Sequence, residues 1–268
     1  TSNHHGKEFP PPPGKRISFS VSTTIHNAGF QHCGLPFTYT VHESDSIDGV
    51  AVLIASDYFG GESVSMPVTP QLHLPHHLAE LEGVGVKELE YSCIIFHKFC
   101  NEQTETARLI GAINILIVEV NANERIIIGD NTDWSSLYSI VTAYSTKAQH
   151  QPNTGLVIGG GVKDDFKSVF EIKVVPRLRE LPEHPEVVIG TVPAESTAET
   201  RFSSLFGNRG LCVDMAYKPS QKPLFTVAQQ TQGWDTVTGV EVLLAQDFDQ
   251  FLLWTSAAEG DYGGSNCG

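Results

Sequence analysis

Residues 155–161 read GLVIGGG, a short apolar segment that runs directly into three glycines. Further short apolar segments flank or follow it, with loop or helix character between them: 171–175, 186–189, 211–217 and 234–237. Short apolar strands separated in this way are typical of a parallel sheet covered by helices. Glycines after the first strand also open dinucleotide-binding folds, but three consecutive glycines occur in plain loops too, so both interpretations stay open at this point.

The first half of the chain predicts a second α/β unit. Residues 114–120 and 125–128 predict a β-hairpin around Asn121–Asn123, and FTYTV at 37–41 predicts a strand. Residues 49–56 fit either a short helix or a short strand. Helices are predicted over 22–33, 70–81, 134–148 and 240–255, and brief strands over 15–19 and 64–66. We expect the two halves to join near Asp133–Trp134.

The composition excludes several classes of protein. The 268 residues include 17 basic and 31 acidic side chains, a formal net charge of −14, which argues against a nucleic-acid-binding surface. No apolar run approaches the roughly 20 residues of a membrane span. Five irregularly spaced cysteines make a disulfide framework improbable and favour the cytoplasm or nucleus: Cys33, Cys93, Cys100, Cys212 and Cys267. The histidines of HLPHH (73–77) have no Cys or carboxylate partners at ligand spacing, so no metal is expected.

Six stretches together resemble the motifs of the shikimate dehydrogenase family, in the order in which that family has them. They are SFSVSTTIHN (18–27), ESVSMPVT (62–69), ARLIGAINIL (107–116), GDNTDW (129–134), CVDMAYKPSQKPL (212–224) and GVEVLLAQDFDQFLLW (239–254). The resemblance implies an α/β protein with an N-terminal α/β substrate domain, residues 15–133 with 239–258, and a Rossmann-like NADP-type domain, 134–238. Residues 1–14, with their proline run, would be a linker that points to a longer parent chain, and 259–268 a tail.

Members of this family reduce 3-dehydroshikimate with NADPH, and the resemblance transfers their site residues to this chain. Ser20 and Ser22 would bind the substrate carboxylate, and Asn114, Asp133 and Gln246 the ring hydroxyls. Ser65 and Tyr217 would line the same site. The doubtful cofactor positions would be Gly159, Gly160, Gly161 and Gly239. A polyol acid needs several directed neutral donors and acceptors, which fits this set. Each residue could instead be a helix cap or a buried hydrogen-bonding group, and Ser22 is well placed to cap a helix.

Three departures from the family argue against catalysis. Thr69 stands where the family has its catalytic lysine, the partner of Asp133, and loss of a positioned acid–base group typically costs about 10²–10⁴-fold in rate. Only 24 residues separate Gly161 from Glu186, whereas one β-α-β crossover alone takes roughly 30. The Rossmann-like domain is therefore expected to lack the helix end and the Asn-Arg-Thr motif that would hold NADP phosphates. Residues 82–106 look like an insertion.

The motifs that remain indicate a binding domain that has lost catalysis. The chain resembles most the shikimate dehydrogenase-like C-terminal domain of the fungal quinate repressor, itself similar to the fungal pentafunctional shikimate-pathway polypeptide. That resemblance implies a sensor of a quinate- or shikimate-type acid, with a transcription activator protein as partner and NADP lost. Two alternatives stay open. One is an active NADP-dependent shikimate or quinate dehydrogenase, with the odd segments being sequence errors, and the other is a structural relic without ligand.

Overall fold

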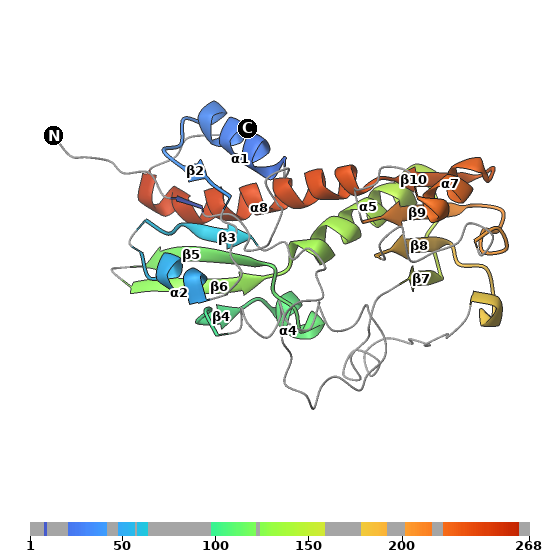
Figure 1. Ribbon diagram of the computed structural model, residues 1–268, viewed down its shortest axis with the longest axis horizontal. Helices are drawn as coiled ribbons and strands as arrows, with labels where there is room; N and C mark the ends of the chain where they lie inside the picture. The colour runs from blue at the N-terminus through green and yellow to red at the C-terminus, as the bar shows by residue number, and fades with distance from the viewer. Residues whose placement is uncertain are drawn as a thin grey trace. The chain divides into compact units, whose positions relative to one another are not determined.

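The computed structural model describes residues 8–9, 21–41, 48–56, 58–63, 98–121, 124–158, 178–191, 202–215 and 222–262 (Figure 1). The chain divides into two compact units. The first comprises Thr1–Asp133 with Asp247–Gly268, and the second comprises Trp134–Gln246. Each unit contains its own four-stranded sheet.

The sheet of the first unit is built around a β-hairpin. Its strands are β3 (Gly61–Ser63), β5 (Ile115–Asn121), β6 (Glu124–Asp130) and β4 (Glu102–Gln103), in the spatial order β3-β5-β6-β4. β5 and β6 are antiparallel, with Ile115 opposite Asp130 and Asn121 opposite Glu124. This register leaves residues 122 and 123 as the connection, so the predicted hairpin is confirmed. A separate pair, β1 (Glu8–Phe9) and β2 (Thr38–Tyr39), is parallel.

The apolar run at the start of β5 is explained by burial on both faces. Leu116 and Val118 belong to one hydrophobic cluster, while Ile115 and Ile117 belong to another that includes Trp254. Successive side chains of a strand point to opposite faces, so a strand with a core on each side has no polar positions to alternate with. The helices of this unit are α1 (Ser22–His32), α2 (Asp48–Ile54), α4 (Glu105–Ile110) and the later part of α8 (Gly239–Tyr262).

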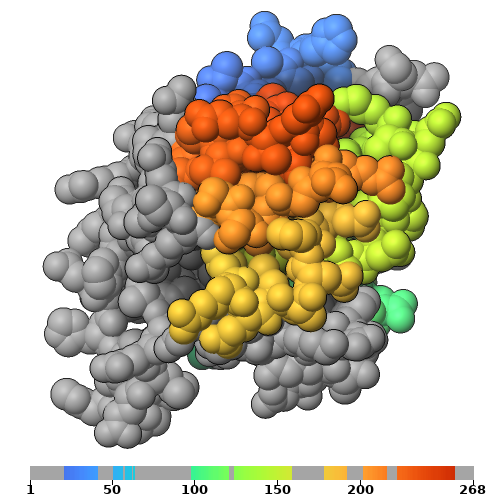
Figure 2. Space-filling model, turned by 90° about the vertical axis from the view of Figure 1, so that its right-hand side faces the viewer, coloured from blue at the N-terminus to red at the C-terminus, as the bar shows by residue number. Residues whose placement is uncertain are grey.

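The second unit has a fully parallel sheet. Its strands are β7 (Gly155–Ile158), β8 (Val187–Gly190), β9 (Gly210–Asp214) and β10 (Trp234–Val237), in the order β10-β9-β8-β7. The space-filling view shows residues 178–191 (yellow) beside 202–215 (light orange), as the pairing of β8 with β9 requires (Figure 2). α5 (Thr132–Ala148) and α7 (Pro223–Gln230) accompany the sheet, with a 3-10 turn at Leu178–Glu180. The predicted α/β class is therefore confirmed.

Several boundaries differ from those expected. β9 ends at Asp214 rather than continuing to 217, and α8 runs to Tyr262, seven residues beyond the predicted end. The ambiguous segment 49–56 forms a helix, α2. Ser22 is the first residue of α1, but Val21 occupies the N-cap position, so Ser22 is not the cap. The segments expected at 15–19, 64–66, 70–81 and 171–175 lie outside the described residues.

The end of the expected insertion belongs to the core of the first unit. Within residues 98–106, β4 pairs in parallel with β6, and Phe99 and Cys100 pack against a hydrophobic cluster. This part of the segment is therefore a sheet edge packed on the core, and the prediction of an insertion stays a prediction. Cys33 is disulfide-bonded, whereas Cys100 and Cys212 are free thiols. The expectation of reduced cysteines therefore does not hold at Cys33.

Candidate functional site

The β5–β6 hairpin brings two of the sequence motifs together. Asn114 immediately precedes β5, and Asn131, Thr132 and Asp133 immediately follow β6. Because Ile115 lies opposite Asp130, the open ends of the two strands meet, and Asn114 N donates to Asp130 O at 3.0 Å. The GAINIL and GDNTDW motifs, distant in sequence, thus form one local site.

A chain of hydrogen bonds fixes the Asn114 side chain. Its Oδ1 accepts from Thr132 N at 2.8 Å and from Thr132 Oγ1 at 3.2 Å. Since an amide oxygen accepts and an amide nitrogen donates, both contacts show that the oxygen end of the Asn114 amide faces Thr132. The side chain of Asn114 also hydrogen-bonds the Asp133 carboxyl group. Asn114 and Asp133, two of the predicted ligand-binding residues, are therefore in direct contact.

Asp133 carries an unusual carboxyl group. Desolvation by the surrounding protein raises its pKa to about 6, although the side chain keeps some exposed surface, while the hydrogen bond from Asn114 lowers the pKa. Burial disfavours the charged form, and a donor to the carboxylate favours it. Near neutral pH, Asp133 is still mainly a carboxylate and can accept a hydrogen bond from a hydroxyl group. Mild acid adds a proton and removes that property.

A second set of contacts holds the turn from β6 into α5. Thr104 Oγ1 donates to Asp130 Oδ1 at 2.6 Å while accepting from Ala107 N at 3.1 Å, so Thr104 both caps α4 and restrains Asp130. Asp130 Oδ1 also accepts from Asn131 N at 2.8 Å. Asn131 Nδ2 donates to Ala112 O at 3.2 Å. These bonds join the turn to Thr104, at the start of α4, and to Ala112, which lies shortly before β5. They therefore restrain the position of Asp133.

The structure adds Thr132 and Gln250 to the site, and it shows a buried pair, His26 and Asp247, that the sequence analysis did not assign. Gln250 donates from Nε2 to Thr132 Oγ1 at 3.1 Å. His26, on α1, and Asp247, on α8, are buried side by side, with Nε2 and Oδ1 3.4 Å apart. A polar residue on a mostly apolar helix face is the signal that could have identified Gln250 and Asp247. Without the helix–helix contact, however, such a residue cannot be assigned a partner.

The structure describes only some of the predicted site residues. Ser22, Asn114 and Asp133 lie in the first unit, with Ser22 buried at the start of α1. Gln246 and Gly239 lie in the part of α8 that belongs to the second unit. The other predicted positions lie outside the described residues: Ser20, Ser65, Thr69, Tyr217, Gly159, Gly160 and Gly161. Their roles therefore stay predictions.

A dinucleotide in this kind of sheet binds at the carboxyl ends of the strands. Asp214 is the last residue of β9 and lies at this edge of the sheet. There, Lys222 Nζ donates to Asp214 Oδ1 at 2.5 Å, with exposures of only 4% and 6%. The two charges neutralise each other away from solvent, so Lys222 does not offer a phosphate a free cation. The glycine-rich turn after β7, where the pyrophosphate would bind, lies outside the described residues. Among the residues described, no His, Cys, Asp or Glu cluster could hold a metal, and no helix is long and apolar enough for a membrane.

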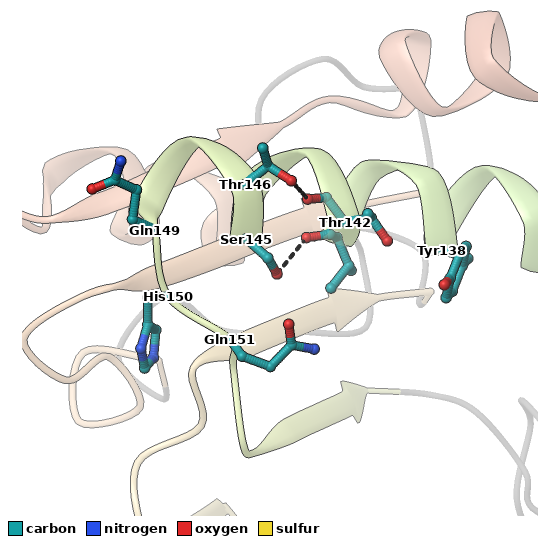
Figure 3. Close-up of a pocket in the computed structure, with 8 residues that line it drawn as sticks. Tyr138, Thr142, Ser145, Thr146, Gln149, His150 and Gln151 are labelled. Atoms are coloured by element: carbon teal, nitrogen blue, oxygen red, sulfur yellow. Dashed lines mark hydrogen bonds between the residues drawn. The ribbon is translucent and has the colours of Figure 1, made fainter.

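A cavity of about 410 Å³ lies along α5 in the second unit. Figure 3 shows Tyr138, Thr142, Ser145 and His150 among its lining residues. Ser145 Oγ donates to Val141 O at 2.9 Å, so that hydroxyl hydrogen is already used. None of the predicted site residues lines this cavity.

Comparisons with known proteins agree with the sequence motifs. No protein-family model matches the chain. The chain is 30% identical, over 285 aligned residues and 90% of its own length, to the pentafunctional AROM polypeptide of Malassezia globosa. It spans 16% of that polypeptide's length.

Solved structures share its fold. The dehydroquinate dehydratase and shikimate dehydrogenase of S. pombe AroM is 24% identical with a TM-score of 0.67, covering 93% of this chain and 50% of the other. Shikimate 5-dehydrogenase from Listeria monocytogenes, solved with shikimate and NAD, is 18% identical with a TM-score of 0.65, covering 96% and 94%. The motifs, the sequence identity and the fold together show that the chain belongs with the shikimate dehydrogenase-like domains.

Proposed function

We propose that this chain binds a quinate- or shikimate-type acid and does not reduce it. The observation that carries the proposal is the contrast between two positions of the family's catalytic pair. Asp133 is retained and is held by Asn114, while the partner lysine is replaced by Thr69. A carboxylate with a neutral amide beside it suits a hydroxylated ring, because both groups form directed hydrogen bonds to hydroxyls.

Reduction would require groups that the described residues do not supply. NADP, when bound in this family, supplies a hydride to the ring carbonyl carbon, and an acid must give its oxygen a proton. A threonine hydroxyl at position 69 is too weak an acid for that task near neutral pH. Lys222 is already paired with Asp214 and buried. These features support binding without turnover, and with it the loss of NADP.

The biological role that we infer is that of a sensor. Ligand binding would stabilise the domain and alter its contact with a transcription activator protein, as part of a repressor of quinate utilisation in the cytoplasm or nucleus. A domain that binds a pathway acid reports its concentration because the bound fraction, and the added stability, follow the ratio of ligand concentration to Kd.

The alternative is an active NADP-dependent shikimate or quinate dehydrogenase. It is favoured by the names of the relatives, since the Malassezia protein is a pentafunctional polypeptide and the Listeria enzyme was crystallised with shikimate and NAD. For this alternative to hold, the chain would need another acid–base group, because Thr69 stands where the family has its lysine.

Calorimetric titration with shikimate, quinate, 3-dehydroshikimate and NADPH, each added separately, tests the proposal. Binding of an acid with no binding of NADPH is the expected result. Binding of NADPH, followed by its oxidation in the presence of 3-dehydroshikimate, would instead establish the enzyme. Absence of binding by all four compounds would leave a structural domain without ligand.

A further inference from the structure

Gln250 is a buried polar residue whose amide is hydrogen-bonded at its nitrogen end, whereas its Oε1 is buried without a hydrogen-bond partner among the described residues. Its side chain is 6% exposed, and its Nε2 donates to Thr132 Oγ1 at 3.1 Å. An amide buried in a helix–sheet interface costs free energy unless it is hydrogen-bonded. The chain could place an apolar residue here, as it does at Trp254 one turn later. We therefore infer that Gln250 has a role in the polar site that it contacts.

The direction of each hydrogen bond in the chain follows from chemistry. The Gln250 Nε2 group can only donate, so Thr132 Oγ1 accepts from it. The one hydroxyl hydrogen of Thr132 is then directed to Asn114 Oδ1, 3.2 Å away. With Oδ1 occupied by Thr132, the Nδ2 end of Asn114 is the end that can donate to the Asp133 carboxylate. The bonds thus run in one direction from Gln250 to Asp133.

The helix that carries Gln250 is fixed on both sides of it. One turn earlier, Asp247 contacts His26 with Nε2 and Oδ1 3.4 Å apart. One turn later, Trp254 Nε1 donates to Leu116 O, on β5, at 3.1 Å. These contacts join α8 to α1 and to the hairpin strand that follows Asn114. Gln250 is therefore presented to Thr132 by a rigid part of the first unit.

We propose that Gln250 is a positioning residue for Asp133, acting through Thr132 and Asn114 to hold the Asn114 amide in the orientation that donates to the carboxylate. The inference rests on the proposed function only in the use of Asp133 for ligand binding. Without Gln250, the Thr132 hydroxyl loses the donor that directs its hydrogen toward Asn114 Oδ1, so one of the two restraints on the Asn114 amide is weakened.

The test is the pKa of Asp133 in the ligand-free protein, measured by carbon-13 NMR of the carboxyl group across pH 4–8. We expect Gln250→Leu to raise that pKa further, by about 0.5–1 unit, because the donor that favours the charged form is less well held. Thr132→Val should give a similar rise, and Thr132→Ser, which keeps the hydroxyl, should retain most of the original value. Gln31→Leu, the same change at an exposed position of α1, is the matched control.

Two outcomes would overturn the inference. One is an unchanged Asp133 pKa in folded Gln250→Leu and Thr132→Val proteins. The other is an equal rise in Gln31→Leu. If Gln250→Leu does not fold, the Thr132 pair decides alone, since threonine and valine have nearly the same shape.

Acid binding is measured separately, so that the two proposals can fail independently. If the wild-type protein binds shikimate or quinate, Gln250→Leu should weaken binding about 3–10-fold near pH 7, through loss of part of a directed hydrogen bond. If the wild-type protein binds neither acid but the NMR shifts occur, the sensor proposal fails while the positioning of Asp133 stands.

Discussion

His26 and Asp247 form a buried pair between α1 and α8, with His26 Nε2 and Asp247 Oδ1 3.4 Å apart and side-chain exposures of 0% and 1%. Aromatic rings surround the imidazole: Tyr39 at 4.7 Å, Trp254 at 5.0 Å and Phe30 at 6.2 Å between centroids. Within the described part of the chain, His26 Nδ1, His26 Nε2 and Asp247 Oδ2 have no hydrogen-bond partner, so the 3.4 Å approach is a close polar contact and not a hydrogen bond. The two side chains therefore depend on each other.

Removing one member of this pair should be costly. In His26→Leu, the Asp247 carboxylate stays buried without its partner, and the free energy of unfolding should fall by about 3–5 kcal/mol. Urea denaturation followed by circular dichroism measures the change.

Two further variants separate charge from packing at this position. The double variant His26→Leu with Asp247→Leu removes both polar groups and should recover most of the lost stability, because apolar pairs often replace buried ion pairs at no cost. His32→Leu alters an exposed histidine on the same helix and should change stability by less than about 0.5 kcal/mol. Equal losses in His26→Leu and the double variant would contradict this account.

Two lysine–aspartate pairs in the described part of the second unit should differ sharply. Lys222–Asp214 is almost fully buried, while Lys147–Asp235, at 2.8 Å, has side-chain exposures of 74% and 47%. Lys222→Met should lower stability by about 3–5 kcal/mol, because it leaves a buried carboxylate unpaired. Lys147→Met should cost far less, because water screens the exposed pair. Thermal unfolding of both variants checks this, and similar losses would show that burial is not the deciding factor.

Asp133→Asn should stabilise the protein at neutral pH. Its pKa, raised to about 6 by desolvation, means that the folded state holds a proton between about pH 4 and 6 that the unfolded state has released. Stability from this group is therefore present below about pH 4 and lost as pH rises through 6. Asparagine carries no charge to desolvate, so the variant should be more stable at pH 7 by up to about 3 kcal/mol.

The pH dependence supplies the control for that prediction. The difference in unfolding free energy between Asp133→Asn and the wild type should vanish below about pH 4, where the carboxyl group becomes protonated in the unfolded state as well as in the folded state. A constant difference from pH 4 to 8 would indicate a packing effect unrelated to titration.

Gly61 is expected to tolerate no side chain. A Cβ there would overlap Trp254 Nε1 and lie 2.7 Å from Leu116 O, so Gly61→Ala would disturb the hydrogen bond between those two residues. We expect a loss of about 1–3 kcal/mol, as for other overpacked sites, and a change in Trp254 fluorescence. Gly155→Ala is the matched control, because its nearest contact would be an ordinary 3.8 Å. A loss in Gly155→Ala as large as that in Gly61→Ala would contradict the steric explanation.

Local patterns predicted most of the described elements correctly. The hairpin 114–128 and the strand 234–237 are present because each has a continuous apolar or β-branched run bounded by polar turns. The end of α8 was predicted too early, since GDY after residue 259 carries no apolar periodicity, although the helix continues through it. The strand at 102–103 was not predicted, because β4 is two residues long and depends on β6 for its pairing.

The sequence by itself determined the α/β class, the order of the motifs and the family, because these follow from periodicity and from residue types at fixed spacings. It also identified Asn114 and Asp133 as members of one motif set. Only the tertiary structure decided that Gln250 reaches Thr132 and that Asp247 lies against His26. Those contacts join residues more than one hundred positions apart, and no local pattern encodes which helix face meets which strand end. The raised pKa of Asp133 has the same origin, since desolvation depends on the atoms that folding packs around the carboxyl group.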